Sequence, residues 1–590
     1  MKKFALSLFM LFAAYLAFSQ HSVNIKILET SDVHGAIFPY DFIRNETLNA
    51  GLARAYTYIK QERANPNQQV ILLDNGDILQ GQPTVYYSNF VDTLNPNIVS
   101  RVFNYMKYDA GTVGNHDIEA GPKVYRKVER EFNFPWMAAN AVDTRTGKPT
   151  FKPYTIIERN GVKVAVLGLI TPGISKWLPS ILWPNMKFND MIESATYWVK
   201  YIKQNENPDI MVGLFHSGHN PEYGGASPSD SLNENASLLV AQKVPGFDVI
   251  LIGHDHDEFN QKVQNVNGDS VLILDPRSSA KLVSDCSITL NYDKDGKLTS
   301  KHVSGQLVKT AKFEPDPQFM NEFKDYYNTV SEYVKEPVGT FTKTISSADA
   351  YFGPCDFIDF INQSQLDLTD TDISFAAPLS FISKIKEGTI TVSDMFKLYR
   401  YENFLYTMML KGSEVDAYLE YSVSLWFNTM KEPSDHLLKF TTDANGYIVK
   451  NKQGQVELVN RYYNFDAAAG INYIVDVTKP DGDKVTILSM ADGTPFNPNK
   501  MYKVAVNSYR GNGGGGHLTK GAGLTPEQLQ ERIVNSTDRD IRLLLMNYIK
   551  SKGTITPKKL NSWKIVPDKL VQNAIKTDRL LLFGSSNHNE

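Results

Sequence analysis

The alternation of apolar and polar positions divides the chain into two regions. From Val23 to about Lys309, short apolar runs alternate with longer amphipathic stretches. Short apolar runs bounded by polar residues are typical of buried strands, and the amphipathic stretches between them are typical of helices. This alternation predicts an α/β domain over residues 20–310. The expected strands are Val70–Leu73, Val164–Leu169, Ile210–Phe215, Val249–Ile252 and Val271–Leu274.

A charged segment, residues 311–340, separates this region from the second one. It begins with two prolines and ends at Pro337-Val338-Gly339. Between them, four apolar residues recur at helical spacing, which predicts a linker helix. These residues are Phe319, Phe323, Tyr327 and Val330.

The second region, residues 341–567, is again expected to be α/β. The pattern predicts a helix over Gly412–Ser422 and strands over Ile471–Val477 and Tyr502–Val506. Residues 568–590, which are polar at their end, are expected to form a loosely held tail.

The N-terminus has the pattern of a secretory signal. Lys2 and Lys3 precede an apolar stretch that runs from Phe4 to Phe18, and Ser19 completes a small-residue cleavage pattern. The stretch is shorter than the ~20 residues that a membrane span needs, and no later segment qualifies. We therefore expect residues 1–19 to be a signal peptide, the protein to be exported to the periplasm, and no segment to span the membrane.

Composition and charge limit the possible partners. The 590 residues exceed the ~250 at which domains usually split, so two large domains are expected. A formal net charge of -4 provides no basic field for a nucleic acid polymer, which favours a small substrate. With Cys286 and Cys355 as the two cysteines, the fold does not depend on a disulfide framework, and whether they pair stays open.

The candidate chemistry lies in five polar segments of the first region. They are Asp32-Val33-His34, Asp74-Asn75-Gly76-Asp77, Gly114-Asn115-His116-Asp117, His216-Ser217-Gly218-His219 and Gly253-His254-Asp255-His256. Four of them follow apolar runs, and α/β sheets place their sites at the carboxyl ends of strands, so these residues are expected to converge. The chain has 11 histidines. His34, His116, His216, His254 and His256 lie in these segments, as does His219.

Imidazoles and carboxylates suit Zn, Mn, Fe or Co, and two such ions ~3.5–4 Å apart can stabilise an in-line displacement at phosphorus. A pair of ions also needs a bridging carboxylate. Asp77 is the natural bridge because it follows a buried strand and Gly76 allows close backbone approach. One such segment alone is more often a capping Asp or a satisfied buried His, whereas five in order point to a two-metal hydrolase.

In this order the five segments resemble the calcineurin-like metallophosphoesterases, and the second region is similar to that of the exported 5'-nucleotidase and cyclic-nucleotide phosphodiesterase family. The resemblance implies a four-layer αββα domain followed by a C-terminal α/β nucleoside-binding domain. It is strongest for the 2',3'-cyclic-nucleotide 2'-phosphodiesterase/3'-nucleotidase branch, because the 5'-nucleotidase branch usually has an Asn-Gly-Gly segment where this chain has Ala376-Ala377-Pro378. The other segments that carry it are Asn140–Asp143, Tyr463–Asp466, Asp476–Thr478 and Asn507–Arg510.

The resemblance also implies roles for single residues. One divalent ion would bind Asp32, His34, Asp77 and His256, and the other would bind Asp77, Asn115, His216 and His254. His116 would be the catalytic histidine, with either Glu119 or Asp117 as its orienting partner. His219 fits a supporting role better than that of a ligand.

The same resemblance places nucleoside binding in the second region. Phe465 and Tyr509 would stack on the two faces of the base, and Asp466 and Arg510 would contact the substrate. The alternative is that either ring is ordinary core. The glycine run 511–516 lacks the Lys-Ser/Thr continuation of a P-loop, so we interpret it as a flexible binding loop.

These observations together predict an exported dimetal phosphoesterase that hydrolyses 2',3'-cyclic nucleotides to 3'-nucleotides and then to nucleosides. The alternative among enzymes is a 5'-nucleotidase or UDP-sugar hydrolase with the same metals. A non-catalytic nucleotide-binding protein or adhesin is a remote alternative, because such a protein would be expected to have lost metal ligands.

Overall fold

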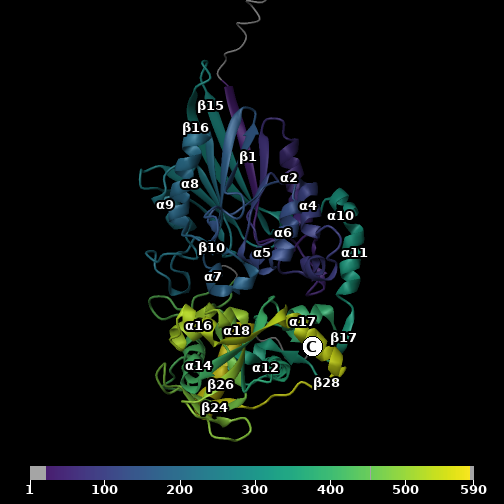
Figure 1. The fold of residues 1–590 in the computed structure, drawn as a ribbon, viewed down its shortest axis with the longest axis vertical. Coiled ribbons are helices and arrows are strands. Elements are labelled where there is room, and N and C mark those ends of the chain that lie inside the picture. The colour runs from purple at the N-terminus through teal and green to yellow at the C-terminus, as the bar shows by residue number, and fades with distance from the viewer. Residues whose placement is uncertain (1–20, 452–453, 585–590) are drawn as a thin grey trace, which may run out of the picture. The chain divides into compact units, whose positions relative to one another are not determined.

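A computed structural model describes residues 21–451 and 454–584 (Figure 1). The expected signal peptide, residues 1–19, lies outside the described residues. The chain forms two compact units. The first extends to Ser331 without residues 176–179, and the second comprises these four residues and the chain from Glu332 onward.

The first unit contains two six-stranded sheets. In spatial order, one consists of β16 (Leu298–Lys309), β15 (Leu282–Tyr292), β1 (His21–Thr30), β4 (Gln69–Asp74), β5 (Ala110–Thr112) and β6 (Trp136–Met137). The other consists of β13 (Glu258–Gln264), β14 (Ser270–Pro276), β12 (Val249–Ile252), β11 (Ile210–His216), β9 (Val162–Ile170) and β8 (Tyr154–Arg159). All five apolar runs expected to be strands lie in these sheets.

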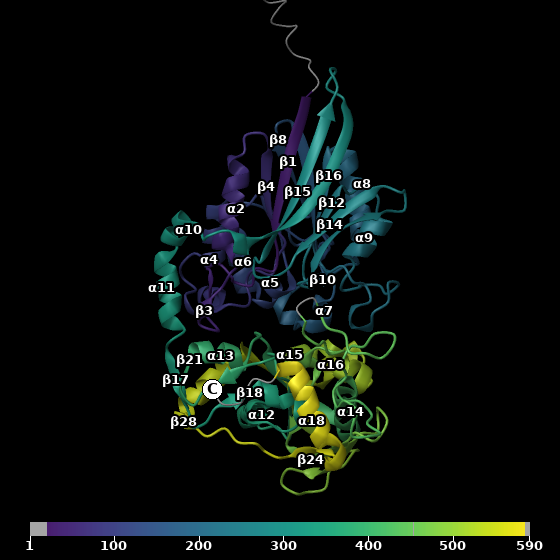
Figure 2. The same ribbon diagram turned by 180° about the vertical axis from the view of Figure 1, so that it is seen from behind.

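The main core of this unit lies between the two sheets. Ile27 and Leu73 of the first sheet pack with Val212 and Leu251 of the second, all almost completely buried. Helices cover the outer faces: α2 (Leu52–Ala64) and α4 (Ile98–Met106) on one side, α8 (Met191–Asn205) and α9 (Ser237–Lys243) on the other (Figure 1 and Figure 2). The predicted αββα arrangement is therefore confirmed.

Strand direction brings the candidate segments together. β1, β4, β5 and β6 run parallel, and so do β9, β11, β12 and β14. Their carboxyl ends therefore share one edge of each sheet. In the second sheet the antiparallel strands β8 and β13 lie at the two edges, and in the first sheet the antiparallel strand β15 lies between β1 and the edge strand β16.

The segment expected to be one linker helix is instead two short helices, α10 (Pro317–Glu322) and α11 (Lys324–Tyr333). The break lies at Phe323, whose backbone angles (φ -104°, ψ 13°) are not helical. Phe319 and Phe323 are buried, and Phe319 packs on Tyr56 of α2 and Tyr105 of α4. Apolar burial against the first unit, which a free linker would not provide, explains the spacing of these residues.

The second unit contains a five-stranded sheet in the order β23 (Ala467–Ala469), β19 (Ile373–Ala376), β26 (Met501–Asn507), β22 (Phe404–Lys411) and β27 (Ile533–Asp540). Two three-stranded sheets accompany it: β21 (Gly388–Thr391), β17 (Pro337–Phe341) and β28 (Thr554–Ile555), and β25 (Val485–Met490), β24 (Ile471–Asp476) and β29 (Trp563–Val566). The main helices are α12 (Asp356–Thr369), α14 (Gly412–Trp426) and α17 (Ile541–Lys552). The predicted helix and both predicted strands are confirmed.

The expected loose tail is wrong for most of its length. Residues 568–583 form α18 (Asp568–Phe583), which buries Val571 and Ala574. Asp578 of this helix is fully buried and accepts a hydrogen bond from the backbone N–H of Leu438. The apolar face of α18 thus holds it against the second unit, while residues 585–590 lie outside the described part.

The structure also bears on the two cysteines and on membrane-spanning segments. Cys286 and Cys355 are both buried and both free. Within residues 21–451 and 454–584, none of the helices has the length and apolar character that crossing a membrane requires.

Candidate functional site

Five loops at the carboxyl ends of strands carry the expected metal ligands. Asp32 and His34 follow β1, and Asp77 follows β4. Asn115 begins the short helix α5 (Asn115–Glu119) after β5. In the second sheet, His216 ends β11, while His254 and His256 follow β12.

Three of these side chains form a first cluster. The metal-binding atoms of Asp32, His34 and His256 all lie within 4.8 Å of one another. Nε2 of His34 is 3.0 Å from Nε2 of His256, and Oδ1 of Asp32 is 3.3 Å from the latter atom. Three potential donors therefore converge on one point.

A second cluster consists of Asp77, His216 and His254, again within 4.8 Å. Asn115 joins it, because its Oδ1 lies 2.8 Å from Nδ1 of His254 and 3.1 Å from Nε2 of His216. Nε2 of His216 is also 3.2 Å from Oδ2 of Asp77. This set matches the second ligand group that the resemblance implied.

Asp77 lies between the two clusters. Its Oδ2 is 4.0 Å from Nε2 of His34 in the first and 3.2 Å from Nε2 of His216 in the second. Within the described residues, Oδ2 of Asp77 and Oδ1 of Asp32 are buried without a hydrogen-bond partner. Leaving a buried carboxylate oxygen unsatisfied is costly, so both atoms fit a bound cation.

Charge couples these groups. Burial acts to lower the pKa of His216, but the negative charge of the neighbouring Asp77 outweighs burial and raises the pKa to about 10. Burial likewise acts to raise the pKa of Asp77, and the charges of His216 and His116 hold it well below its usual value. The raised pKa of His216 means that its extra proton balances the charge of the Asp77 carboxylate. A metal ion would take over this role, so metal binding should release the proton from His216.

The backbone of this site is strained. Non-glycine residues rarely adopt a positive φ, which costs roughly 1–3 kcal/mol each and is concentrated at functional sites. Hydrogen bonds between loops hold some of these conformations, such as the one from the N–H of Asp32 to the carbonyl of Gly76. The residues are Asp32 (φ 50°), His34 (φ 48°), Asp77 (φ 56°), His254 (φ 82°) and His256 (φ 61°).

Glycine is required where the Asp77 loop meets the Asn115 loop. Gly76 has φ 86°, and a Cβ on it would lie 2.6 Å from the backbone nitrogen of Gly114. A Cβ on Gly114 would lie 2.2 Å from Oδ1 of Asp77. Any side chain at either position would push Asp77 away from its partners.

His116 lies beside the first cluster with its orienting partner in place. Its Nδ1 is 2.5 Å from Oε2 of Glu119, and its ring centre is 5.4 Å from that of His34. Its backbone N–H donates to Oδ1 of Asp77. The imidazole is thus held in one orientation by a carboxylate, as a proton-transferring histidine requires.

Asp117 does not share that role. Its fully buried carboxylate accepts hydrogen bonds from the backbone N–H groups of Gly114, Asp77, Ile78 and Leu79. The expectation that Asp117 orients His116 is therefore corrected: it fastens the loop after β4 to the loop after β5.

His219 lies outside both clusters. Its ring stacks on Phe259 at 4.4 Å, and its Nδ1 is 2.9 Å from Oδ2 of Asp255. The backbone N–H of His219 donates to the same oxygen. His219 thus braces the residue between His254 and His256. Asp257 completes a third group that could hold a cation, but Asp255 already has these donors.

The sequence did not predict which groups contact the outer ring nitrogens of the ligand histidines, those that face away from the clusters. Nδ1 of His34 contacts the carbonyl of Gln80 at 3.1 Å, and Nδ1 of His216 contacts the carbonyl of Asn75 at 2.6 Å. Nε2 of His254 contacts Oε1 of Glu234 at 3.1 Å. Backbone carbonyls leave no signal in a sequence, and Glu234 lies in an irregular loop without a motif.

In the second unit, Phe465 does not offer a surface for stacking. It is 2% exposed. One face stacks on Trp426 with ring centres 5.3 Å apart, and Phe427 and Trp563 pack around it. Its expected role in binding the base is therefore corrected to one in the core, which was the alternative.

Tyr509 is half-buried and lies on the short helix α15 (Ser508–Gly511) before the glycine run. The guanidinium of Arg510 lies 5.3 Å from the centre of its ring. A Cβ on Gly514 would lie 2.6 Å from the ring, so the glycine is needed for this close contact. Of the two expected rings, Tyr509 retains exposed surface.

Asp466 and Arg510 are buried against each other. Nε of Arg510 is 2.9 Å from Oδ2 of Asp466, and the side chains of Arg510 and Asp466 are 2% and 3% exposed. Arg510 also donates to the carbonyl of Gly514 and to Oδ1 of Asn464. The expectation of direct substrate contacts is corrected, because these groups are used in holding the glycine loop.

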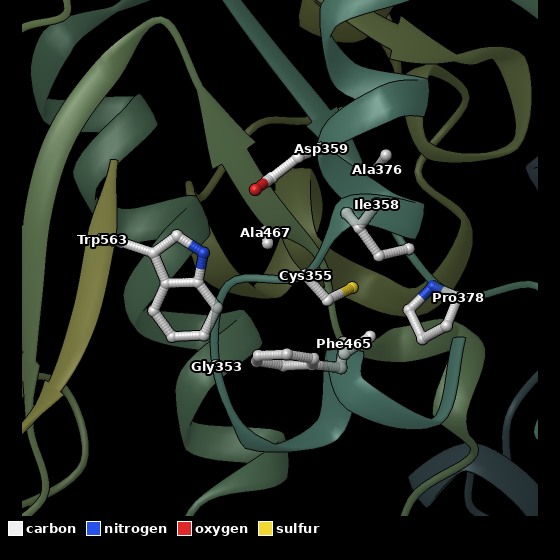
Figure 3. A pocket seen from close by; sticks show the side chains of 10 residues that line it. Gly353, Cys355, Ile358, Asp359, Ala376, Pro378, Phe465, Ala467 and Trp563 are labelled. Carbon is white, nitrogen blue, oxygen red and sulfur yellow. The ribbon is translucent and has the colours of Figure 1, made fainter. Parts of the chain in front are cut away.

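A small pocket lies behind Phe465 (Figure 3). Asp359 and Trp563 point into it among apolar side chains, and within the described residues the buried Nε1 of Trp563 has no hydrogen-bond partner. Burial raises the pKa of Asp359 to about 6, although the backbone N–H of Leu560 acts to lower it. This pocket shares no residue with the metal clusters.

Comparison with known families and proteins agrees with this geometry. Residues 25–258 match the calcineurin-like phosphoesterase family, and residues 337–520 match the 5'-nucleotidase C-terminal domain. The chain is 29% identical to the trifunctional nucleotide phosphoesterase YfkN of Bacillus subtilis, over 92% of this chain but 39% of that protein. It is 26% identical to the 2',3'-cyclic-nucleotide 2'-phosphodiesterase/3'-nucleotidase of Haemophilus influenzae, over 94% of this chain and 89% of that one.

Solved structures share the fold. A Staphylococcus aureus structure in complex with alpha-ketoglutarate, provisionally named a 5'-nucleotidase, matches with a TM-score of 0.75 and 21% identity, covering 92% of this chain and 99% of that one. A 5'-nucleotidase precursor from Thermus thermophilus matches with a TM-score of 0.61 and 21% identity over the same shares. At this identity the likeness concerns the fold alone.

Proposed function

Because the chain carries a calcineurin-like phosphoesterase domain followed by a 5'-nucleotidase C-terminal domain, we propose that it is a dimetal phosphoesterase acting on nucleotides. The substrates are 2',3'-cyclic nucleotides and the 3'-nucleotides formed from them. This chain matches 89% of the Haemophilus enzyme that is named for these two activities. The chain covers 39% of the length of the Bacillus protein, so the further activities of that longer protein are not proposed for this chain.

The observation that carries the proposal is the position of Asp77 between two clusters of metal-binding atoms. One ion would be held by Asp32, His34, Asp77 and His256, and the other would be held by Asp77, Asn115, His216 and His254. When bound, a pair of Zn, Mn or Co ions supplies Lewis acidity and an activated water. The orphaned oxygens of Asp32 and Asp77 support these assignments.

The chain's own residues supply proton transfer and binding. Water adds to phosphorus as the bond between phosphorus and the 2' oxygen breaks, which leaves the 3' monoester. A second water then adds to phosphorus as its bond to the 3' oxygen breaks, which releases inorganic phosphate and the nucleoside. Each attacking water gives up one proton to the solvent, which balances the proton that the leaving oxygen takes up. His116, oriented by Glu119 through Nδ1, donates the proton to each leaving oxygen from Nε2. Tyr509 stacks on the base, and the Arg510–Asp466 pair holds the loop beside it.

We further propose that residues 1–19 direct export to the periplasm and are removed. The proposed domains are residues 20–310 and 341–567, joined by 311–340. The exported activity would convert extracellular nucleotides to nucleosides for uptake.

Phosphate release from 2',3'-cAMP, 3'-AMP, 5'-AMP and UDP-glucose, with Mn or Zn supplied, tests the proposal. We expect the first two to be hydrolysed with higher kcat/KM than the last two. Preference for 5'-AMP or UDP-glucose would contradict the substrate and favour the 5'-nucleotidase alternative. Binding of two ions and of nucleotide without turnover of any of the four would favour the non-catalytic alternative.

A further inference from the structure

The imidazole of His254 differs from those of two other candidate ligands in the group that contacts its outer ring nitrogen, the one that points away from the cluster. His34 and His216 each place Nδ1 against a backbone carbonyl, which accepts a hydrogen bond from Nδ1 and leaves Nε2 to face the clusters. His254 is reversed: Nδ1 faces Oδ1 of Asn115, and Nε2 faces Oε1 of Glu234 at 3.1 Å. Its outer partner is therefore a carboxylate on a side chain.

This contact selects a tautomer. A carboxylate can only accept, so Nε2 of His254 carries the proton and Nδ1 presents its lone pair. That lone pair meets Oδ1 of Asn115, also an acceptor, at 2.8 Å. Two acceptors at this distance repel each other unless a cation or proton is shared between them, as a metal ion at the second cluster would be.

The backbone around Glu234 is anchored, which keeps the carboxylate in reach. The carbonyl of Glu234 accepts hydrogen bonds from Oγ1 of Thr171 and Oγ of Ser217, at 3.0 and 2.8 Å. Its side chain is 29% exposed and that of His254 10%.

We propose that Glu234 is a positioning residue that increases the affinity of the site for one of the two metal ions. This is the ion that Asp77, Asn115, His216 and His254 would hold. The inference rests on the proposed function, because it requires these residues to be ligands. Carboxylate partners of ligating histidines orient the ring and increase its basicity, and their removal typically weakens metal affinity ~10–100-fold. Glu234 contacts His254 and not the ligands Asp32, His34 and His256, so the ion that these three would hold should keep its affinity.

Titration of the metal-free full-length protein with Co²⁺, followed by visible absorbance and by ion content after gel filtration, tests this. In the parent we expect two ions per chain. Glu234→Ala should bind one ion as the parent does and the other ~10–100-fold more weakly. Glu234→Gln keeps an acceptor oxygen, so its loss should be smaller. Glu222→Ala, an exposed glutamate of the same loop, is the matched control and should bind both ions normally.

The outcomes separate the two proposals. If the parent binds fewer than two ions, the dimetal function fails and the role of Glu234 fails with it. If the parent binds two ions and Glu234→Ala binds both with parental affinity, the role of Glu234 alone is overturned. A lower melting temperature of metal-free Glu234→Ala, with both ions weakened equally, would also overturn it, because this is the behaviour of a residue that only supports the fold. Should Glu234→Ala not fold, Glu234→Gln decides: a selective weakening of one ion supports the proposal, and parental affinity for both contradicts it.

Discussion

The metal-ligand clusters of the first unit and the Arg510–Asp466 pair of the second use buried polar groups in opposite ways. In the first, carboxylates and imidazoles converge on two points, and the buried oxygens of Asp32 and Asp77 have no hydrogen-bond partner within the described residues. In the second, Asp466 and Arg510 are almost completely buried and satisfy each other. Unsatisfied polar atoms cost stability and are retained where a ligand completes them, whereas satisfied pairs specify local structure.

The difference shows which residues a motif can identify. The side chains that bind one metal ion must converge on one point. A motif of ligand-type residues at strand ends therefore also indicates where those side chains lie. A nucleoside site needs exposed ring surface, and a motif cannot distinguish an exposed ring from a buried one. Tyr509 and Phe465 lie in equally suggestive segments, but only Tyr509 keeps exposed surface.

The largest effect is expected at the residue that joins the clusters. Asp77→Asn removes the charge that two ions would share, so the site should hold at most one of them and activity should nearly vanish. Metal content and turnover of 2',3'-cAMP measure this. If the variant holds two ions per chain and keeps near-parental turnover, the unsatisfied carboxylate of Asp77 is not completed by shared ions, and the contrast with the Arg510–Asp466 pair is lost.

A smaller effect is expected beside the clusters. His116→Ala should lower kcat ~10²-fold or more through loss of proton transfer, with metal content unchanged, because His116 lies outside both ligand groups. Ion analysis of the purified variant provides the check. Loss of an ion would make His116 a ligand and contradict the assignment.

The two aromatic residues test the second unit directly. Tyr509→Ala should lower kcat/KM for 3'-AMP roughly ten- to a hundredfold, as expected for ~1–3 kcal/mol of stacking, and should leave bis-p-nitrophenyl phosphate within about threefold of the parent.

Phe465→Ala serves as the contrasting variant. Because its ring is packed in the core, the substitution should cost ~3–5 kcal/mol of stability and should not discriminate between the two substrates. Melting temperature and both kinetic assays measure this. A selective loss on 3'-AMP with a parental melting temperature would restore Phe465 to the binding site.

The smallest effect is a pH dependence in the second unit. The pKa of Asp359 is raised from 3.8 to about 6, so the stability that its protonated form provides is present below pH ~4 and lost as the pH rises through ~6. Asp359→Asn stays neutral. The metal-free variant should therefore exceed the parent by about 1–3 kcal/mol at pH 7.5 and match it near pH 4. Equal differences at both pH values would mean that Asp359 does not titrate on unfolding.

Much of the fold followed from local pattern. The apolar runs that form β4, β9, β11, β12 and β14 are recognisable because strands buried between a second sheet and a layer of helices have apolar residues on both faces. The linker segment was misinterpreted because helical spacing continues across Phe323, and the backbone break there leaves no trace in the spacing. The tail was misinterpreted because its polar end concealed the apolar face of α18.

For the site, the sequence by itself determined the ligand types and their order, since each follows a recognisable strand or forms a motif. Only the tertiary structure decided which carboxylate orients His116, that Asp117 fastens loops, that Phe465 is core, and that Glu234 stands behind His254. Strand ends are local properties of the chain. Contacts such as that of Glu234 with His254 join loops from different strands, and side-chain direction at such contacts is set by packing rather than by neighbouring residues.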